Sequence, residues 1–559
     1  MWLSCSAGAG TSSRAGSTWR HKCRLTAAVA TVAAALTAAL LAGTPPASAS
    51  TTETVIVTSS GLLSPVSAVL EVLGTVVTQF HIIDGVEATI PEVLEPVLAA
   101  LPGITVTPDV SVSVQDTTDP TESIGPHTPS DEFLEQTGAS QLAAQGDTGQ
   151  GVTVAVLDTG IDNLPDFTGR LIGGVDLTGG NNPFDDAYGH GTFVAGLIAG
   201  DGASSGGQYS GEAPGANLVS IKVAGASGDT DLVTVILGLQ WAIDHEQTYG
   251  IRILNLSLGF QPFTSTVINP LDQAVEAAWN SGIAVVAAAG NAGPSNGTIL
   301  SPGDDPLVIT VGALDDMAQP VVSDDEMTNF SSVGPTSPDG WVKPDLVTSG
   351  RSVVSLAAPG STVYDQNPSA RVGAANFVGS GTSFSTAITS GAAALVLADN
   401  PGLTPDQLKA RLLGTTNPGP VGNPFVDGHG ALDAYAAATS GPMNLAQSDL
   451  GVLPTLPGAT VSLSPAGNNA DTWNASLWSG VSLPAVSVSG SAWNGWQWNG
   501  EEWNGLVWTG KAWNNGGWDG AAWNGAAWTG KAWNNAAWAG SAWAGAAWSG
   551  SAWNASAWN

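Results

Sequence analysis

Between residues 132 and 440 the chain alternates short aliphatic runs with longer segments of helical periodicity, and this alternation limits the fold more than any other feature. The aliphatic runs are near-continuous, as expected of strands that are buried on both faces. Candidate strands lie at 152–157, 218–223, 251–256, 283–288 and 307–311, and candidate helices at 231–249, 270–281, 386–399 and 404–413. Thr404 is the expected cap of the last helix, with Gln407 three residues later. The pattern predicts an α/β fold with a mainly parallel sheet and helices on both faces.

The first 49 residues have the composition of an export signal. Four basic residues precede an apolar stretch at 25–42, and Ala47-Ser48-Ala49 fits the small-residue pattern of a cleavage site. A retained transmembrane helix is the alternative, but Pro45-Pro46 and the many small residues favour removal. We therefore expect a bacterial Sec-type signal peptide, a secreted protein, and no membrane span after signal removal.

The cysteine content limits the disulfides that the chain can form, and its charge limits the classes of binding partner. Cys5 and Cys23 both lie in the predicted signal, so the exported chain is expected to contain no disulfide. Signal removal takes four of the 14 basic residues and none of the 47 acidic ones, which leaves a net charge near −37. Such an acidic chain is not expected to bind nucleic acid or anionic membranes.

Residues 50–115 show a second pattern, in the order strand, helix, strand, strand, helix, strand. The expected elements are 53–59, 65–73, 76–83, 85–90, 91–101 and 104–115. This predicts a small ferredoxin-like α+β domain, a type with many functions. Its position after the signal favours a propeptide over an independent module. The Pro-, Asp- and Thr-rich stretch 116–131 would be an exposed linker that is cut during maturation.

Beyond residue 440 the composition changes to a linker at 441–472 and then to a repeat at 473–559. Tryptophan recurs at every fifth residue from 493 to 558, fourteen times in all, and Thr509–Asn515 recurs as Thr529–Asn535. A five-residue step would make the rings spiral around a helix, so turn pairs and very short strands are expected, in a solenoid or a hairpin stack. The rings could stack on sugars of a cell wall or other polysaccharide surface, or pack on one another.

Four blocks in the α/β region contain candidate catalytic residues, and three of them are described first. Asp158 ends the aliphatic run 152–157, His190 follows Gly189 at the expected start of a helix, and Ser383 precedes the apolar run from Ala387. A serine at a helix N-terminus lies beside unpaired backbone N–H groups that can stabilise an oxyanion. Taken singly, each residue also has an ordinary structural interpretation, as a strand-end turn, a helix-start polar group or an N-cap.

Asn291 ends the small-residue run 287–290, where its amide could donate a hydrogen bond into a cleft, although a turn asparagine is the simpler interpretation. Ser257-Leu258-Gly259 follows another strand and could pair its backbone with an extended peptide.

Together these blocks resemble the subtilisin-like serine peptidases, the subtilase family, over residues 132–440. The resemblance rests on the order of the four blocks, which is Asp, His, Asn, Ser. It also rests on three short motifs, Asp158-Thr159-Gly160, His190-Gly191-Thr192 and Gly381-Thr382-Ser383. It implies a secreted serine endopeptidase in which Ser383 is the nucleophile, His190 the base, Asp158 its orienting group and Asn291 an oxyanion donor. It also implies peptide substrates that bind at Ser257-Leu258-Gly259, and residues 50–115 acting as an intramolecular chaperone and inhibitor.

The sequence departs from the family pattern at one position of the helix start, and metal binding stays open. Ala387 stands where the family commonly has proline, which should loosen the helix start without removing a chemical group. No cofactor is expected, no metal ligand is assigned, and a structural calcium stays open because the loop 201–211 offers no complete ligand set. We expect a monomer. The alternative function is a surface-binding or adhesive protein that uses the tail, with the peptidase region acting mainly in its own maturation.

Overall fold

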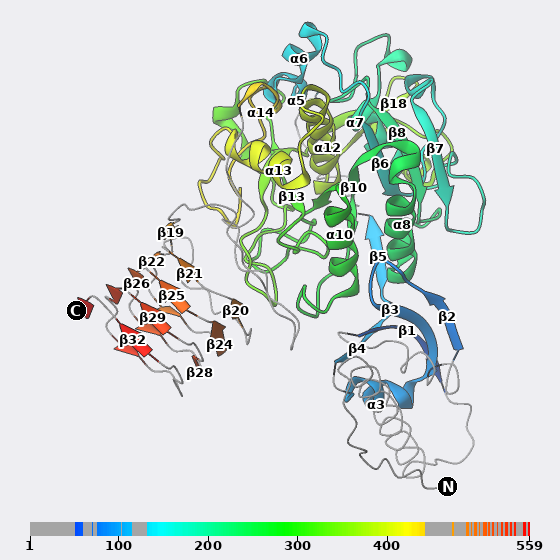
Figure 1. Ribbon diagram of the computed structural model, residues 1–559. Coiled ribbons are helices and arrows are strands. Elements are labelled where there is room, and N and C mark those ends of the chain that lie inside the picture. The colour runs from blue at the N-terminus through cyan, green and yellow to red at the C-terminus, as the bar shows by residue number, and fades with distance from the viewer. Residues whose placement is uncertain are drawn as a thin grey trace, which may run out of the picture. The chain divides into compact units, whose positions relative to one another are not determined.

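The computed structural model describes residues 51–59, 70, 75–101, 103–114 and 131–441, together with the backbone of short strands between 472 and 558 (Figure 1). The predicted signal lies outside these residues, as do nearly all of the helix expected at 65–73 and of both linkers. The chain divides into two compact units, Met1–Asp109 and Val110–Asn559. Over the described ranges, no helix combines the length and the apolarity that crossing a membrane requires.

The first unit contains an antiparallel sheet with the strand order β2-β3-β1-β4. The 3-10 turn η1 and helix α3 follow β3, and Leu94 and Leu98 from them join Val55 and Val57 in the core of the unit. The elements are β1 (Thr52–Ser59), β2 (Thr75–Gln79), β3 (Gly85–Pro91), η1 (Glu92–Leu94), α3 (Glu95–Ala99) and β4 (Ile104–Pro108).

The prediction of a single strand at 104–115 is wrong. It is divided into β4, which ends at Pro108, and β5 (Ser111–Val114), which belongs to a sheet of the second unit. Pro108 has no backbone N–H to continue a ladder, and Asp109 N–H donates to Thr54 O at 3.0 Å.

The second unit is built on an eight-stranded sheet with the order β14-β13-β12-β10-β6-β8-β7, in which β15 also pairs with β13. Every pair is parallel except β13 with β14, which confirms the predicted α/β fold with a mainly parallel sheet. The strands are β6 (Thr153–Asp158), β7 (Leu171–Asp176), β8 (Asn217–Lys222), β10 (Ile251–Leu256), β12 (Ala284–Ala288), β13 (Ile309–Asp315), β14 (Glu326–Met327) and β15 (Leu346–Ser349).

Helices cover this sheet on two sides: α8 and α10 contact each other on one side of β6 and β10, and α7 and α12 contact each other on the other (Figure 1). The predicted helix 231–249 is divided at His245 into α8 and α9, and the helix predicted from 386 begins four residues earlier, at Thr382. Thr404 and Gln407 form the predicted capping box of α13. The helices are α5 (Phe133–Gln136), α6 (Ala139–Gln145), α7 (His190–Ala199), α8 (Leu232–Asp244), α9 (Glu246–Tyr249), α10 (Pro270–Ser281), α11 (Thr362–Gln366), α12 (Thr382–Asp399), α13 (Pro405–Gly414) and α14 (Ala434–Thr439).

Two small antiparallel sheets flank the main one. In the first, β5 lies between β11 (Leu258–Gly259) and β9 (Asp229–Asp231). In the second, β18 (Asn376–Gly379) lies between β16 (Val353–Leu356) and β17 (Arg371–Val372). Strand β18 leads directly to the segment that precedes α12.

In the part of the tail that the structure describes, fifteen short strands form four parallel sheets, and each sheet takes every fourth repeat from β21 onward. Partners in neighbouring strands then lie 20 residues apart, as in Trp498, Trp518 and Trp538. Parallel pairing fits the solenoid alternative, because hairpins pair antiparallel strands. The strands are β19 (Thr472–Asn474), β20 (Val488–Gly490), β21 (Trp493–Asn494), β22 (Gln497–Asn499), β23 (Glu502–Trp503), β24 (Val507–Gly510), β25 (Ala512–Asn514), β26 (Gly517–Trp518), β27 (Ala522–Trp523), β28 (Ala527–Trp528), β29 (Ala532–Asn534), β30 (Ala537–Trp538), β31 (Ala542–Trp543), β32 (Ala552–Asn554) and β33 (Ala557–Trp558).

Candidate active site

Asp158 is the last residue of β6, at the carboxyl end of a strand that pairs with β10 on one side and β8 on the other. Its Oδ1 accepts from the Thr159 backbone N–H at 2.7 Å and lies 2.8 Å from His190 Nδ1. A carboxylate can only accept, so the geometry assigns the ring proton of His190 to Nδ1 and leaves the lone pair on Nε2. This is the tautomer that a general base needs.

His190 is the first residue of α7 and is 3% exposed. Asp186 fixes this helix start, because its carboxylate accepts from Gly189 N–H at 2.7 Å and from Thr192 N–H at 2.8 Å. The same carboxylate accepts from Thr159 Oγ1 at 2.7 Å. Burial raises the pKa of Asp186, and these hydrogen bonds oppose the shift. Asp186 therefore joins the strand end that carries Asp158 to the helix start that carries His190.

Ser383 lies in the first turn of α12, where backbone N–H groups have no partner within the helix. Its Oγ donates to Ser257 O at 3.0 Å, and Ser257 Oγ donates to Ser383 O at 3.0 Å. The ring of Phe384, the next residue, lies 5.8 Å from the ring of His190 between centroids. The structure thus brings the end of β10, the start of α12 and the start of α7 to one edge of the main sheet.

Asn291 lies in the segment after β12, close to the start of α12. Its Oδ1 accepts from both the backbone N–H and the hydroxyl of Thr382, each at 2.9 Å. These two donors identify the oxygen of the amide, so Nδ2 is the free end. Nδ2 is buried, and within the described part of the chain no acceptor lies in hydrogen-bond range. The amide is held with its N–H groups available to a new acceptor.

Strand β5 occupies the groove between Leu258-Gly259 and Asp229–Asp231. Ser113 pairs with Gly259 and Val114 with Leu258 on one side, and Val112 pairs with Thr230 on the other. Val114 N–H donates to Gly228 O at 3.3 Å, and Val112 and Val114 are buried. The predicted peptide-binding segment Ser257-Leu258-Gly259 therefore faces an extended strand of the chain itself.

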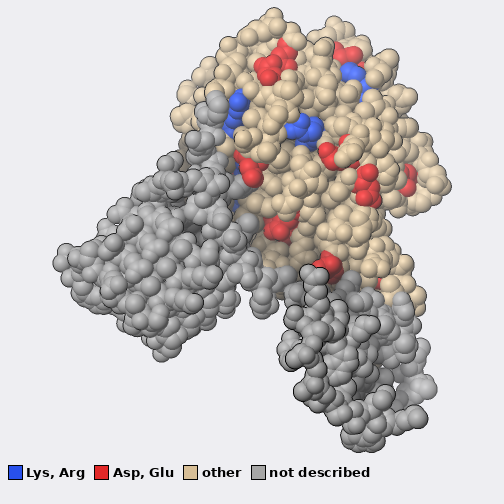
Figure 2. All heavy atoms as spheres, in the orientation of Figure 1, with Lys and Arg blue, Asp and Glu red and all other residues tan. Residues whose placement is uncertain are grey.

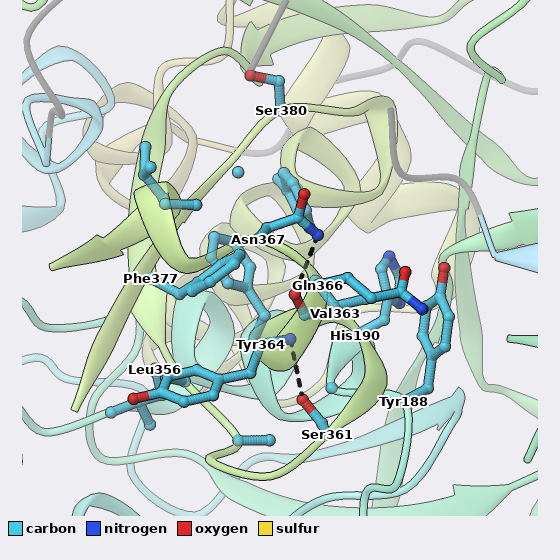
Figure 3. Close-up of a pocket in the computed structure, with 18 of the residues that line it drawn as sticks. Tyr188, His190, Leu356, Ser361, Val363, Tyr364, Gln366, Asn367, Phe377 and Ser380 are labelled. Carbon is cyan, nitrogen blue, oxygen red and sulfur yellow. Dashed lines mark hydrogen bonds between the residues drawn. The ribbon is translucent and has the colours of Figure 1, made fainter. Parts of the chain in front are cut away.

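A pocket of about 150 Å³ opens beside His190, between α7, α11 and β18 (Figure 3). Thr362 N–H and Val363 N–H, at the start of α11, donate to Ala187 O and Tyr188 O, which holds this wall in place. The lining residues are Tyr188, Gly189, His190, Phe193, Leu356, Ala357, Ala358, Ser361, Val363, Tyr364, Gln366, Asn367, Ser369, Ala370, Phe377, Val378, Gly379, Ser380 and Phe384.

Several residues around this site were not among the sequence candidates, namely Thr159, Asp186, Thr382 and Phe384. Asp186 carried the clearest sequence signal, because an aspartate shortly before a helix start is a common cap. Within the described ranges, no three or more His, Cys, Asp or Glu side chains are grouped as a metal site would require.

Comparison with known proteins agrees with this geometry. Residues 149–440 match the model of the subtilase family. The serine protease AprX of Bacillus subtilis is 44% identical over 312 residues, which are 54% of this chain and 70% of that protein. Subtilisin NAT of Bacillus subtilis subsp. natto is 35% identical over 309 residues, 55% of this chain and 70% of that protein. The fold is similar to that of fervidolysin from Fervidobacterium pennivorans, a keratinolytic enzyme related to subtilisin, with a TM-score of 0.57 and 24% identity over 72% of this chain and 63% of that one.

Proposed function

Because the chain belongs to the subtilase family and is a serine endopeptidase, we propose that Asp158, His190 and Ser383 are its catalytic triad and that Asn291 binds the oxyanion. The observation that carries this proposal is the buried contact of 2.8 Å between Asp158 Oδ1 and His190 Nδ1, at the same sheet edge as Ser383. Its substrates are proteins and peptides.

In the proposed reaction, the Ser383 hydroxyl turns from Ser257 O toward His190 Nε2, which accepts its proton as Oγ attacks the scissile carbonyl carbon. The negative charge moves to the carbonyl oxygen, where Asn291 Nδ2 and the Ser383 backbone N–H donate hydrogen bonds. His190 then gives the proton to the leaving amine, and the C–N bond breaks. A water molecule, deprotonated by His190, hydrolyses the resulting ester and restores Ser383. Each step uses groups of the chain, so we propose that no cofactor is required.

We also propose that the enzyme matures by cutting its own chain. The support is the position of β5, which pairs with β11 as an extended substrate would. Val114 pairs with Leu258, and the residue before Leu258, Ser257, accepts from the nucleophile through its backbone carbonyl. In the sequence, Gln115 follows Val114. Cleavage after Gln115 would leave β5 in the groove as a bound product, in keeping with residues 50–115 as an inhibitory propeptide.

The sequence and the surface of the chain support proposals for its location and its partners. The export-like sequence of residues 1–49 supports secretion, and a monomer is proposed. The face shown in Figure 2 carries scattered acidic and basic residues, with no continuous basic surface, which is in keeping with no nucleic-acid partner. The match over residues 149–440 favours the enzyme over a mainly adhesive protein, so binding of a polysaccharide surface by the tail is proposed as an addition to catalysis.

A serine-directed fluorophosphonate probe with intact-mass readout tests the proposal. The wild-type protein should gain one probe mass on Ser383 and lose the residues before the maturation site. Ser383→Ala should gain no probe and keep its full length after signal removal. Cleavage of the purified Ser383→Ala protein in the 115–131 region would show that maturation does not depend on this site.

A further inference from the structure

A buried chain of hydrogen bonds lies behind the proposed nucleophile, between strand β10 and helix α12, which contact each other (Figure 1). Ser390 Oγ donates to Asn255 Oδ1 at 2.9 Å, and Asn255 Nδ2 donates to Ser257 Oγ at 2.9 Å. Ser257 Oγ then donates to the backbone carbonyl of Ser383 at 3.0 Å. All four residues are 0% exposed, so each polar group depends on the chain itself for its hydrogen bonds.

The donors and acceptors of this chain can be arranged in one way only. The Ser383 carbonyl can only accept, so the single hydroxyl proton of Ser257 points to it. Asn255 must then present its amide nitrogen to Ser257, which leaves the amide oxygen to accept from Ser390. The Ser390 hydroxyl therefore selects the orientation of the amide. A flipped Asn255 would present its oxygen to Ser257 and draw that proton away from Ser383.

Ser257 and Ser383 hold each other, because the hydroxyl of each donates to the carbonyl of the other at 3.0 Å. Ser257 lies between the last residue of β10 and the first residue of β11, the strand that pairs with β5. Its hydroxyl bonds to the backbone of Ser383, so this bond can persist when the Ser383 hydroxyl turns toward His190. The bond thus fixes the nucleophile relative to the edge to which the proposed function assigns the peptide.

We propose that Asn255 and Ser390 are positioning residues for the nucleophile, and that they act through the Ser257 hydroxyl on the backbone of Ser383. This inference rests on the proposed function, because it takes Ser383 as the nucleophile. Both residues are fully buried, and Ser390 lies ~10 Å from Ser383 along the helix axis, so neither touches substrate. A displacement of ~1 Å in a reacting group can cost ~100-fold in rate, so a loosened Ser383 should lower kcat and leave KM unchanged.

The test begins with two single substitutions. Ser390→Ala should lower kcat by ~5- to 10-fold. Ser257→Ala keeps the backbone carbonyl, removes the hydroxyl that holds Ser383, and should lower kcat by ~10- to 100-fold. KM should stay unchanged in both. Both variants should also react more slowly with the fluorophosphonate probe, which reports on the nucleophile without a bound peptide.

Thr389→Val is the matched control for Ser390→Ala. Thr389 is equally buried on the same helix, but its hydroxyl donates to Ser385 O at 2.9 Å, within α12. The control should keep the wild-type kcat and labelling rate. All proteins are compared well below their lowest melting temperature, so that unfolded protein does not enter kcat.

The double variant Ser257→Ala/Ser390→Ala separates positioning from a purely structural role. If Ser390 acts through the Ser257 hydroxyl, its loss should lower kcat no further once that hydroxyl is gone. Single effects that multiply in the double variant would overturn the proposal. So would a Ser390→Ala protein with the same kcat and labelling rate as Thr389→Val.

The probe also distinguishes the two proposals. A wild-type protein that the probe does not label, or labels at a residue other than Ser383, would contradict the proposed function itself. Labelling of wild-type Ser383, combined with equal rates in Ser390→Ala and Thr389→Val, would overturn the positioning roles alone.

Discussion

Thr382 holds the side-chain oxygen of Asn291 with two hydrogen bonds of 2.9 Å, one from its backbone N–H and one from its hydroxyl. The two residues are 91 positions apart in the sequence and meet where the segment after β12 reaches the start of α12. With its oxygen occupied, the amide can present only N–H groups to the site. Thr382 is therefore a positioning residue for the proposed oxyanion donor.

Replacing Asn291 by alanine should lower kcat by ~100- to 1,000-fold with little change in KM, the range known for one lost oxyanion donor in subtilisin. Thr382→Val keeps the backbone donor but removes the hydroxyl, and should lower kcat less, by about 10-fold. Steady-state kinetics on one soluble peptide checks both variants. A raised KM with unchanged kcat in Asn291→Ala would show that Asn291 positions substrate instead.

Asp186→Asn should lower kcat by ~10- to 100-fold without changing KM, because an amide nitrogen cannot accept the N–H groups that now fix the start of α7. Asp166→Asn is a matched control. Asp166 is equally buried and accepts from Ser204 N–H at 3.1 Å, but it is not bonded to Thr159 or to the residues around His190. Melting temperatures measured alongside kcat separate an effect on catalysis from an effect on stability. If both variants lose stability and activity in the same proportion, Asp186 acts on the fold alone.

The sequence was sufficient to predict Asp158 at a strand end, because a near-continuous aliphatic run stops there, and His190 at a helix start, because glycine precedes it. It could not predict which of two adjacent aspartates, Asp185 or Asp186, fixes the start of α7, since that depends on the packing of the loop against Thr159. The division between β4 and β5 was missed for a similar reason. Both halves have strand character, and only the two separate sheets distinguish them.

Glu212 should make stability depend on pH. It is 1% exposed beside Gly391 of α12, and burial raises its pKa to about 8. The unfolded chain releases this proton near pH 4.5, so the contribution of Glu212 to stability is complete below that pH and is lost as pH rises toward 8. At ~1.4 kcal/mol for each pKa unit, the loss is at most about 5 kcal/mol.

Glu212→Gln, made in the Ser383→Ala background to prevent self-digestion, should therefore reduce the fall in unfolding free energy between pH 5 and pH 8. Urea unfolding at the two pH values measures the difference in each protein. Equal pH dependence with and without Glu212 would mean that the carboxyl is solvated or paired in the native state.

Truncation after residue 445 should leave hydrolysis of a small soluble peptide unchanged. The truncated chain keeps α14, the last helix of the peptidase region, and every residue of the proposed triad. Among the described residues, the strands after 471 pair with one another in four parallel sheets, and none of these sheets includes a described strand from before residue 441. Tryptophan recurs at the 20-residue register of those sheets. We therefore expect an ordered module whose loss changes adhesion to insoluble cell wall or polysaccharide and does not change kcat/KM. Sedimentation with purified cell wall, with and without the tail, measures that adhesion.

Tryptophan emission of the isolated tail should shift to longer wavelength on denaturation, because ordered rings lie partly out of water. Emission that is already fully red-shifted before denaturant is added would contradict an ordered tail.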